Sequence, residues 1–535
     1  MTRCGLAFGL LLLLVSRALA QEGQGAVMRE WATPGEQRGW FAPTTPAEAN
    51  DYLARLAGSK ETVTLDTLAW VDGGAMDPDS SLPVLLVRLR RPASEDRERL
   101  RVLVLSGESG TDLSGPEVGL QVVREMALGG IGSLLDDLEI SIVPAANPWG
   151  LLWWVPESPS GVDLTRDHLR LRSPSTRAVH DFVRRWQPHL VVELRELGPT
   201  VYRVQAAVPR HPNVDPDLTT YGRFYLLPYV ANELAKNSVL FREYVAVEPD
   251  PGGIGTPLLG ADALPEGAFL TPGELGAKHT LNAFSLAGSL SIMLGVASVG
   301  GAEGLPERVQ MLYESLGYLL EVAAAQAAGL RDRRPSEPSA LSVRQAWARD
   351  GDRPDLVWLV WTDQGRIAQQ TTDRWHPIVR RRLALPVPPA WVIEPEGREW
   401  AELVSAHGFA VERLRRDARI EVGSYPVGRA SHLPPGLADE LPLDSAADGS
   451  DLLVRGERTF PSGSWIVRSD QPALRLLFTL IEPWSQDAPL GREGSVADGS
   501  SNAGLYPVHR IEDGTPTGSL RTEPADLGST RPDPH

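Results

Sequence analysis

Short apolar runs alternate with longer amphipathic segments over the first part of the chain. Runs typical of buried strands occupy residues 82–89, 101–105, 138–143 and 190–194, and apolar residues recur at helical spacing in residues 116–128 and 175–186. Strands that alternate with helices are typical of α/β domains. The pattern predicts a mixed, largely parallel sheet flanked by helices, and functional residues gather at the carboxyl ends of strands in such sheets.

A helix start is predicted at residue 45. Thr45 suits the N-cap position, Pro46 suits the first helical position, and Glu48 completes a capping box. A later helix is predicted at residues 306–330, where leucine and valine recur at helical spacing.

Residues 281–301 carry no charge and have the length of a membrane span. Asn282 and several serines and glycines interrupt the apolar character of this segment. We therefore predict a buried strand flanked by loops, with a membrane span as the alternative.

A second, smaller unit is predicted after a charged, proline-containing linker. Residues 355–361, 390–394 and 410–414 are predicted strands, and residues 397–407 a helix, which together indicate a C-terminal α/β module. The predicted organisation is a signal peptide (1–20), an extended lead-in (21–44), the larger domain (45–330), a linker (331–345), the C-terminal module (346–510) and a disordered tail (511–535).

The N-terminus has the pattern of a signal peptide. Arg3 precedes an apolar run at residues 5–15, and Ala18-Leu19-Ala20 is a small-x-small cleavage site. This run is shorter than the about 20 residues that a membrane span needs. We expect export to the periplasm or the extracellular medium and no integral membrane span after cleavage, with an uncleaved N-terminal anchor as the alternative.

Charge and cysteine content exclude several classes of site. The formal net charge of −17 opposes nucleic-acid binding, which requires a basic face. Cys4 is the single cysteine and lies in the segment that a signal peptidase would remove. The exported chain would then have no disulfide, no thiolate zinc ligand and no cysteine nucleophile.

Four stretches at or near predicted strand ends contain the residues with candidate chemistry. They are SGESGTD (106–112), PAANPWG (144–150), GVDLTRDH (161–168) and VELRELGP (192–199). The first, second and fourth lie at the ends of predicted strands, where a parallel sheet presents its functional residues.

In this order and setting the stretches resemble the zinc carboxypeptidases of the carboxypeptidase A superfamily, in particular the large secreted bacterial type. In that family a Gly-x-x-His-Gly-x-Glu motif supplies two zinc ligands and a strand ending in Asp-x-His-Glu supplies the third. An Asn-Arg pair in Gly-Val-Asp-Leu-Asn-Arg-Asp holds the terminal carboxylate of the substrate, and a later strand, which residues 291–295 resemble, ends in the general-base Glu.

The resemblance extends into the C-terminal module and covers roughly residues 45–510. The matching pieces of the module are residues 406–409, 464–467, 470–472 and 482–487. The resemblance implies the fold of a zinc carboxypeptidase and, for a complete site, peptide hydrolysis with zinc as cofactor.

The sequence departs from the family at the residues that carry the chemistry. Ser109, Asp112 and Arg195 occupy the three ligand positions, and Gly295 occupies the general-base position. Catalytic zinc needs three protein ligands with deprotonated N, O or S atoms. A serine hydroxyl is a poor ligand, and arginine offers only donors and stays charged. We therefore expect no metal ligands, no cofactor and no catalytic residue, unless rearranged ligands hold zinc.

Arg195 suggests what replaces the ion. We expect its guanidinium to pair with Asp112 and Glu196, so that a buried ion pair stands where the family has a metal. Removing one side of such a pair destabilises a protein by about 3–5 kcal/mol.

Arg166 is the candidate substrate-binding residue, because a planar guanidinium suits a carboxylate. The alternative is a structural salt bridge to Asp163 or Asp167.

The histidines and Ser109 each allow a functional and a structural interpretation. His168, His180 and His189 form either a second metal site or a set of satisfied histidines, which we favour because their spacing suits no metal motif. Ser109 has only part of a nucleophile-elbow pattern, since position 111 is Thr where that pattern needs Gly.

The three tryptophans Trp149, Trp153 and Trp154 lie close together in the sequence. They either stack on a sugar or peptide or form a hydrophobic plug over a disused pocket, which we favour.

The sequence thus predicts an exported carboxypeptidase-like protein that is a catalytically inactive pseudopeptidase and binds peptide or cell-wall fragments. An active zinc metallocarboxypeptidase with rearranged ligands and a scaffold without a ligand are the alternatives. They differ on whether any histidine replaces Ser109 or Arg195 in space.

Overall fold

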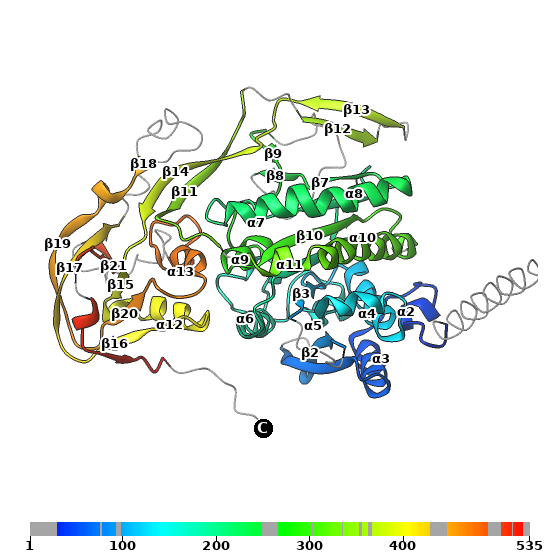
Figure 1. The fold of residues 1–535 in the computed structure, drawn as a ribbon, viewed down its shortest axis with the longest axis horizontal. Coiled ribbons are helices and arrows are strands. Elements are labelled where there is room, and N and C mark those ends of the chain that lie inside the picture. The colour runs from blue at the N-terminus through cyan, green and yellow to red at the C-terminus, as the bar shows by residue number, and fades with distance from the viewer. Residues whose placement is uncertain are drawn as a thin grey trace, which may run out of the picture.

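A computed structural model describes residues 29–74, 77–91, 98–198, 200–248, 266–301, 303–333, 335–351, 356–361, 366–427, 447–490, 504–515 and 517–527. The signal peptide predicted at residues 1–20 lies outside the described residues. An N-terminal domain and a C-terminal module lie side by side (Figure 1). In the part of the chain that is described, no helix has both the length and the apolar character needed to cross a membrane.

An eight-stranded sheet forms the centre of the N-terminal domain. Its strands are β1 (Val63–Gly73), β2 (Asp77–Leu89), β3 (Leu100–Leu105), β4 (Leu138–Val143), β5 (Leu190–Leu197), β6 (Val204–Ala207), β7 (Phe241–Glu243) and β10 (Leu290–Ala297). They lie in the order β1-β2-β4-β3-β5-β10-β6-β7. Strands β4, β3, β5 and β10 are parallel to one another, whereas β2 and β6 join this group antiparallel. The predicted mixed, largely parallel sheet is confirmed.

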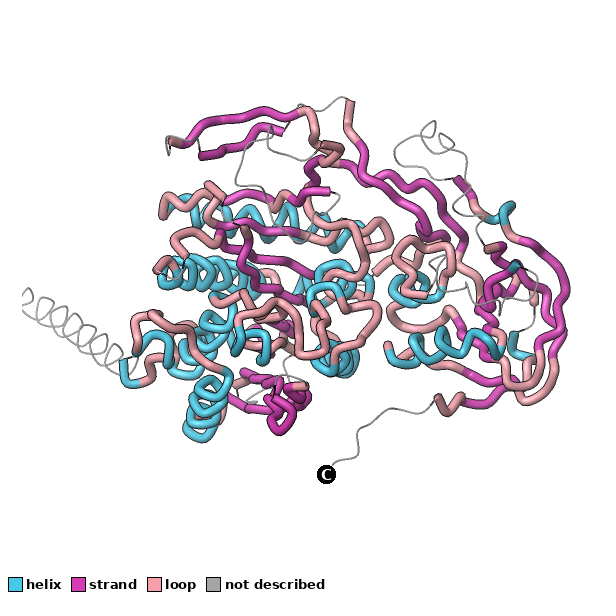
Figure 2. The backbone as a smooth tube through the Cα atoms, turned by 180° about the vertical axis from the view of Figure 1, so that it is seen from behind, coloured by secondary structure: helices cyan, strands magenta, loops and turns pink. Residues whose placement is uncertain are grey.

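Helices cover both faces of this sheet (Figure 2). They are α2 (Pro34–Gln37), α3 (Pro46–Ser59), α4 (Ser114–Leu128), α5 (Pro148–Trp153), α6 (Pro174–Trp186), α7 (Pro216–Tyr221), α8 (Leu227–Lys236), α9 (Thr280–Leu286), α10 (Leu305–Ala325) and α11 (Ala327–Arg331). Adjacent strand residues point to opposite faces. Accordingly, Val102 and Val104 pack with α3, α4, α8 and α10, whereas Leu103 and Leu105 pack with α5, α6 and α9.

The predicted helix start at Thr45 is confirmed. The Thr45 hydroxyl oxygen accepts a hydrogen bond from the Glu48 N–H at 3.3 Å, and the Glu48 carboxylate accepts one from the Thr45 N–H at 2.9 Å. The lead-in differs from the extended segment that we predicted, because Thr33 and Glu36 form a second capping box that begins α2.

Residues 281–301 contain the predicted buried strand, but it begins only at Leu290. The first part of the segment is helix α9 and not a loop. Gly288, with φ of 107°, lies between the helix and β10 and provides the left-handed turn that a side chain would disfavour. All residues of β10 are buried.

The C-terminal module contains several small sheets. Its strands are β11 (Ala340–Ala348), β12 (Leu356–Trp361), β13 (Ile367–Thr372), β14 (Ile378–Pro386), β15 (Ala390–Ile393), β16 (Glu412–Leu414), β17 (Ala418–Pro426), β18 (Ala447–Asp448), β19 (Val454–Phe460), β20 (Trp465–Arg468), β21 (Leu505–Ile511) and β22 (Thr522–Pro524), and its helices are α12 (Arg398–Ala406) and α13 (Leu474–Ile481). The largest sheet has the order β19-β17-β21-β15-β20-β16-β22. Two short strands of the N-terminal domain, β8 (Ala246–Glu248) and β9 (Phe269–Thr271), form a separate pair.

Both ends of the module differ from the predicted boundaries. Strand β11 begins at Ala340, inside the segment predicted as a linker. Strand β22 pairs with β16, so residues 522–524 are ordered and the tail predicted to be disordered from residue 511 is partly wrong. The polar composition of this segment does not indicate a strand, because β22 is held by backbone hydrogen bonds to β16 and not by apolar side chains.

The two units share buried contacts. The Asp487 carboxylate of the module accepts hydrogen bonds from two groups of the N-terminal domain, His211 Nε2 at 3.2 Å and the Ala277 N–H at 3.0 Å. It accepts a third from Gln345 Nε2 of its own module at 3.0 Å. Ala277 and Leu286 of the N-terminal domain also belong to the hydrophobic core of the module. These contacts fix residues 486–489 against the carboxyl-end side of the central sheet.

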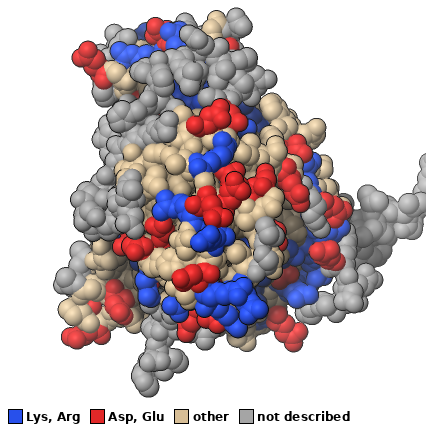
Figure 3. All heavy atoms as spheres, turned by 90° about the vertical axis from the view of Figure 1, so that its left-hand side faces the viewer, with Lys and Arg blue, Asp and Glu red and all other residues tan. Residues whose placement is uncertain are grey.

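Acidic and basic side chains lie next to one another across the face shown in Figure 3. Within the module, Arg468 Nε lies 2.9 Å from Glu412 Oε1, and Arg458 lies 3.0 Å from Glu394. Because opposite charges are paired locally, this side of the molecule has no extended region of one charge sign among its described residues.

Candidate functional site

The four positions that carry the family's chemistry gather at one edge of the sheet. Arg195 lies towards the carboxyl end of β5, directly opposite Gly295 of the neighbouring strand β10. Residues 106–112 follow β3, which pairs with β5 on its other side. The third-ligand and general-base positions of the resemblance are therefore neighbours in space.

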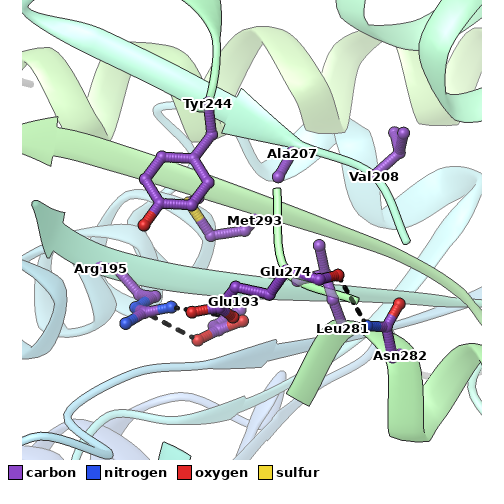
Figure 4. Close-up of a pocket in the computed structure, with 9 residues that line it drawn as sticks. All are labelled: Glu193, Arg195, Ala207, Val208, Tyr244, Glu274, Leu281, Asn282 and Met293. Atoms are coloured by element: carbon purple, nitrogen blue, oxygen red, sulfur yellow. Dashed lines mark hydrogen bonds and ion pairs between the residues drawn. The ribbon is translucent and has the colours of Figure 1, made fainter. Parts of the chain in front are cut away.

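Arg195 lies between two carboxylates (Figure 4). Its Nε is 3.6 Å from Glu193 Oε1, and its Nη1 is 3.8 Å from Glu274 Oε2. The Arg195 side chain is 22% exposed, and that of Glu193 only 5%. Glu274 is held in turn by His279, whose Nδ1 lies 2.9 Å from Glu274 Oε2.

The space around this ion-paired group is small. The cavity that Arg195, Glu193, Glu274, Tyr244 and Met293 help to line has a volume of about 10 Å³. A cavity of this size holds about one water molecule. A scissile peptide bond with its flanking atoms does not fit there, because the arginine side chain fills the position.

The protonation of the carboxylates follows from burial and from Arg195. Burial raises the pKa of Glu193 well above its usual value, against the attraction of Arg195. Burial would also raise the pKa of Glu274, but the charges of His279 and Arg195 outweigh burial and lower it. Burial lowers the pKa of Arg195, yet Glu193 and Glu274 raise it more, so the guanidinium stays charged.

Asp112 is buried close to this group. Burial raises the pKa of the Asp112 carboxyl to about 8, although Arg195 lowers it and Glu196 raises it further. A carboxyl with this pKa is largely protonated at neutral pH. Asp112 is therefore a neutral group here, not an anionic ligand.

The predicted partners of Arg195 are corrected by these contacts. Asp112 acts on Arg195 only through space, and Glu196 points away. The Glu196 carboxylate accepts a hydrogen bond from the Ser114 N–H at 2.9 Å and lies 3.3 Å from Arg308 Nε. The reason is strand geometry, since residues 195 and 196 lie on opposite faces of β5 whereas residues 193 and 195 share one face.

Ser109 and Gly295 offer no catalytic group. The Ser109 Oγ is 2.8 Å from Thr111 Oγ1, with which it shares a hydrogen bond. A Cβ at Gly295 would meet Leu197 Cδ1 at 2.4 Å and Met293 Sδ at 3.0 Å. A glutamate at this position would thus require neighbouring side chains to move.

The donor set does not fit zinc. A hydroxyl, a protonated carboxyl and a guanidinium occupy the ligand positions, and a guanidinium repels a dication. Across the described residues, no three His, Cys, Asp or Glu side chains are grouped so as to hold a metal ion. The chemistry that zinc supplies, activation of a bound water, has no support from these residues.

Arg166 lines a separate and larger cavity of about 810 Å³. It ends the short 3-10 helix at Leu164–Arg166, and its Nε lies 3.6 Å from Asp163 Oδ2. The Asp163 carboxylate also accepts hydrogen bonds from the N–H and hydroxyl of Thr165. Arg166 therefore contacts Asp163 and also lines a cavity in the volume range of ligand sites, and its binding of a carboxylate stays a prediction.

The histidines predicted as an alternative metal site separate into two places. His168 Nδ1 lies 3.0 Å from His180 Nε2, and His168 Nε2 lies 2.8 Å from Glu108 Oε1. His189 instead accepts a hydrogen bond from the Arg101 N–H through Nδ1 at 3.0 Å. Burial lowers the pKa of His180 well below its usual value, so that the pair is a satisfied hydrogen-bonded group in the core.

The tryptophans also differ from one another. Trp149 is buried, and its indole Nε1 donates a hydrogen bond to the Val71 carbonyl oxygen at 2.7 Å. Trp153 packs edge-on against Trp149 at a ring distance of 5.8 Å, whereas Trp154 is 56% exposed. Trp149 and Trp153 serve the packing of the sheet against α5.

The sequence alone did not identify Glu193, Glu274 and His279 as partners around Arg195. It also did not predict that the module lines the cavity of Arg166. Glu193 and Arg195 are two residues apart on a predicted strand, so their side chains could have been predicted to share one face of the sheet. Glu274 and His279 come from a connection far along the chain, and no local pattern identifies them.

Comparisons with known proteins support the resemblance. No protein-family profile matches the chain. Carboxypeptidase 2 of Trichophyton tonsurans is 24% identical over 509 residues, which are 89% of this chain and 88% of that protein. Carboxypeptidase 2 of Trichophyton equinum is 24% identical over 165 residues, 30% of each chain. The chain is thus similar to carboxypeptidases over most of its length, as its motifs predicted.

Among solved structures, a metallo-carboxypeptidase from Pseudomonas aeruginosa is 18% identical, with a TM-score of 0.38, over 53% of this chain and 69% of that one. Bovine thrombin-activatable fibrinolysis inhibitor is 12% identical, also with a TM-score of 0.38, over 53% of this chain and 97% of that one.

Replacing Arg195 with Ala should destabilise the protein by about 3–5 kcal/mol, because it leaves Glu193 and Glu274 without their cation. Thermal and denaturant unfolding measure the effect. The matched control is Arg203→Ala, whose side chain is 21% exposed but whose partner Glu307 is 58% exposed. That change should cost only about 0–1 kcal/mol. An unchanged melting temperature in Arg195→Ala would show that the ion pair has no structural role.

Replacing Asp112 with Asn should stabilise the protein in a pH-dependent manner. The pKa of Asp112 is about 8 in the folded state and lies near 3.8 when the chain is unfolded. The native protein therefore loses stability as the pH rises from about 4 to 8, because the unfolded carboxyl ionises more readily. The advantage of Asn over Asp should be near zero at pH 4 and largest at pH 8, as measured by unfolding across this range. A difference that does not change with pH would contradict the buried, protonated state.

Proposed function

We propose that this chain is an exported carboxypeptidase-like protein that binds peptide or cell-wall fragments and does not hydrolyse them. The observation that carries this proposal is the position of Arg195, whose guanidinium stands at the third-ligand position between Glu193 and Glu274. A fixed positive charge at this point opposes a dication on electrostatic grounds.

The absence of catalytic chemistry is supported at each step of the family's reaction. The ligand positions hold Ser109, Asp112 and Arg195, which cannot together coordinate zinc. Gly295 provides no carboxylate to accept a proton from water. A water molecule with its ordinary pKa does not attack an amide at neutral pH.

Binding is supported by the cavity that contains Arg166. It is about 810 Å³ in volume, within the range of ligand sites, and both units contribute to its walls. In the resemblance, Arg166 holds the place of the arginine that binds the terminal carboxylate of a substrate. A planar guanidinium with two parallel N–H groups suits that carboxylate.

Export is supported by the first 20 residues of the sequence. Arg3, the apolar run at 5–15 and the Ala18-Leu19-Ala20 site together form a signal peptide. A protein that leaves the cytoplasm in this way meets free peptides and cell-wall fragments, which are ligands of the proposed class.

An active zinc carboxypeptidase is the second candidate. The carboxypeptidase names of the curated relatives favour it, since one of them matches 89% of this chain. This candidate requires zinc ligands other than Ser109, Asp112 and Arg195, and it predicts release of a C-terminal amino acid.

Isothermal titration with acetyl-tetraalanine and its C-terminal amide tests the proposal. The free acid should bind at least about tenfold more tightly than the amide, because a charge-assisted hydrogen bond to Arg166 is lost in the amide. Arg166→Gln should remove this difference, whereas Arg398→Gln, an exposed arginine on α12, should keep it.

The same peptide, incubated with protein and added zinc, should release no alanine. Release of alanine would favour the active enzyme, and equal failure of both peptides to bind would favour a scaffold without a ligand.

A further inference from the structure

The acidic side chains that line the large cavity are mostly engaged. Asp487 accepts two hydrogen bonds from the N-terminal domain, from His211 and Ala277, and one from Gln345 of its own module. Asp163 accepts two hydrogen bonds from Thr165 and lies near Arg166. Glu248 also has a partner, and Glu157 is exposed. Three of the four carboxylates are thus already compensated within the protein.

The basic side chains of the same cavity are less well compensated. Lys278 is half-buried and forms no ion pair with any described residue. Arg170 donates a hydrogen bond from Nη2 to the Pro489 carbonyl oxygen at 2.9 Å, and it likewise forms no ion pair within the described ranges. Arg172 lies 3.7 Å from Asp167, whose carboxylate already accepts the N–H groups of Arg172 and Ser173.

These cations come from different walls. Arg170 lies on the segment that follows Arg166, and Lys278 lies on the connection that leads into α9. Trp347 of β11 and residues 486–489 of the module close the cavity from the other unit. The Asp487 hydrogen bonds to His211 and Ala277 hold that wall in place.

We propose that this cavity selects a ligand with a second anionic group, a peptide whose C-terminal residue has an acidic side chain. Arg166 takes the terminal carboxylate, and Lys278 with Arg170 takes the side-chain carboxylate. This inference rests on the proposed function, which supplies the peptide end at Arg166, and adds the chemistry of the residue that carries it.

The physical basis is the cost of an uncompensated cation in a partly closed space. A lysine that is half removed from water gains from a carboxylate partner more than an exposed lysine does, because water screens it less. Hydrogen bonds between charged groups are also shorter and about twice as strong as neutral ones. A neutral amide of the same shape offers Lys278 and Arg170 only a neutral acceptor.

The test compares acetyl-trialanyl-glutamate with acetyl-trialanyl-glutamine by isothermal titration to the purified protein. The glutamate peptide should bind at least about tenfold more tightly. Lys278→Gln should reduce this preference to about twofold, and Lys278→Arg should restore most of it. Arg170→Gln is the second variant, and each variant is used only after its melting temperature confirms folding.

The matched control is Lys236→Gln. Lys236 lies at the end of α8, is 67% exposed and pairs with Glu233, so its replacement should leave the preference unchanged. Equal binding of the two peptides would overturn the inference while the proposed function stands. A preference that persists in both Lys278→Gln and Arg170→Gln would also overturn it. Failure of both peptides to bind would overturn the proposed function and this inference together.

A parallel titration with the D-glutamate form of the peptide distinguishes the two sources of such ligands. Tighter binding of the D form than of the L form would indicate cell-wall peptides, and the reverse would indicate protein C-termini. Either result supports the inference, provided that glutamate of that hand binds more tightly than its glutamine counterpart.

Discussion

The partly buried guanidinium of Arg195, within 4 Å of two carboxylates, is the constraint on which the site depends. Arg195 cannot lose its proton, so Glu274, whose pKa is lowered, supplies its countercharge beside Glu193, in a region that admits about one water. The small cavity has no room for a peptide bond, and the charge of Arg195 opposes a dication there. The strands that carry these groups belong to the mixed, largely parallel sheet, and an ion-paired group lies at their carboxyl ends.

The larger cavity, which Arg166 lines, lies between the two units. Asp487 joins them through two hydrogen bonds, from His211 and Ala277, and this contact closes one wall of the cavity that contains Arg166. The C-terminal module therefore forms part of the wall of this cavity.

Much of the fold could be predicted from periodicity and capping, because those signals are local. Strands β3, β4 and β5 and the Thr45 capping box follow directly from the sequence. The partners of Arg195 could be predicted only in part, since Glu193 shares its strand face whereas Glu274 approaches from a distant connection. Helix α9 and strand β22 were missed because an uncharged segment and a polar tail do not reveal which backbone groups they pair with.

Metal content tests the central claim most directly. The purified protein would be incubated with zinc, freed of excess metal and analysed for bound zinc per chain, with a zinc carboxypeptidase treated in parallel as the positive control. The account predicts less than about a tenth of an ion per chain, since a hydroxyl, a protonated carboxyl and a guanidinium do not form a zinc site. Close to one ion per chain, lost when Arg195 or Asp112 is replaced, would contradict it.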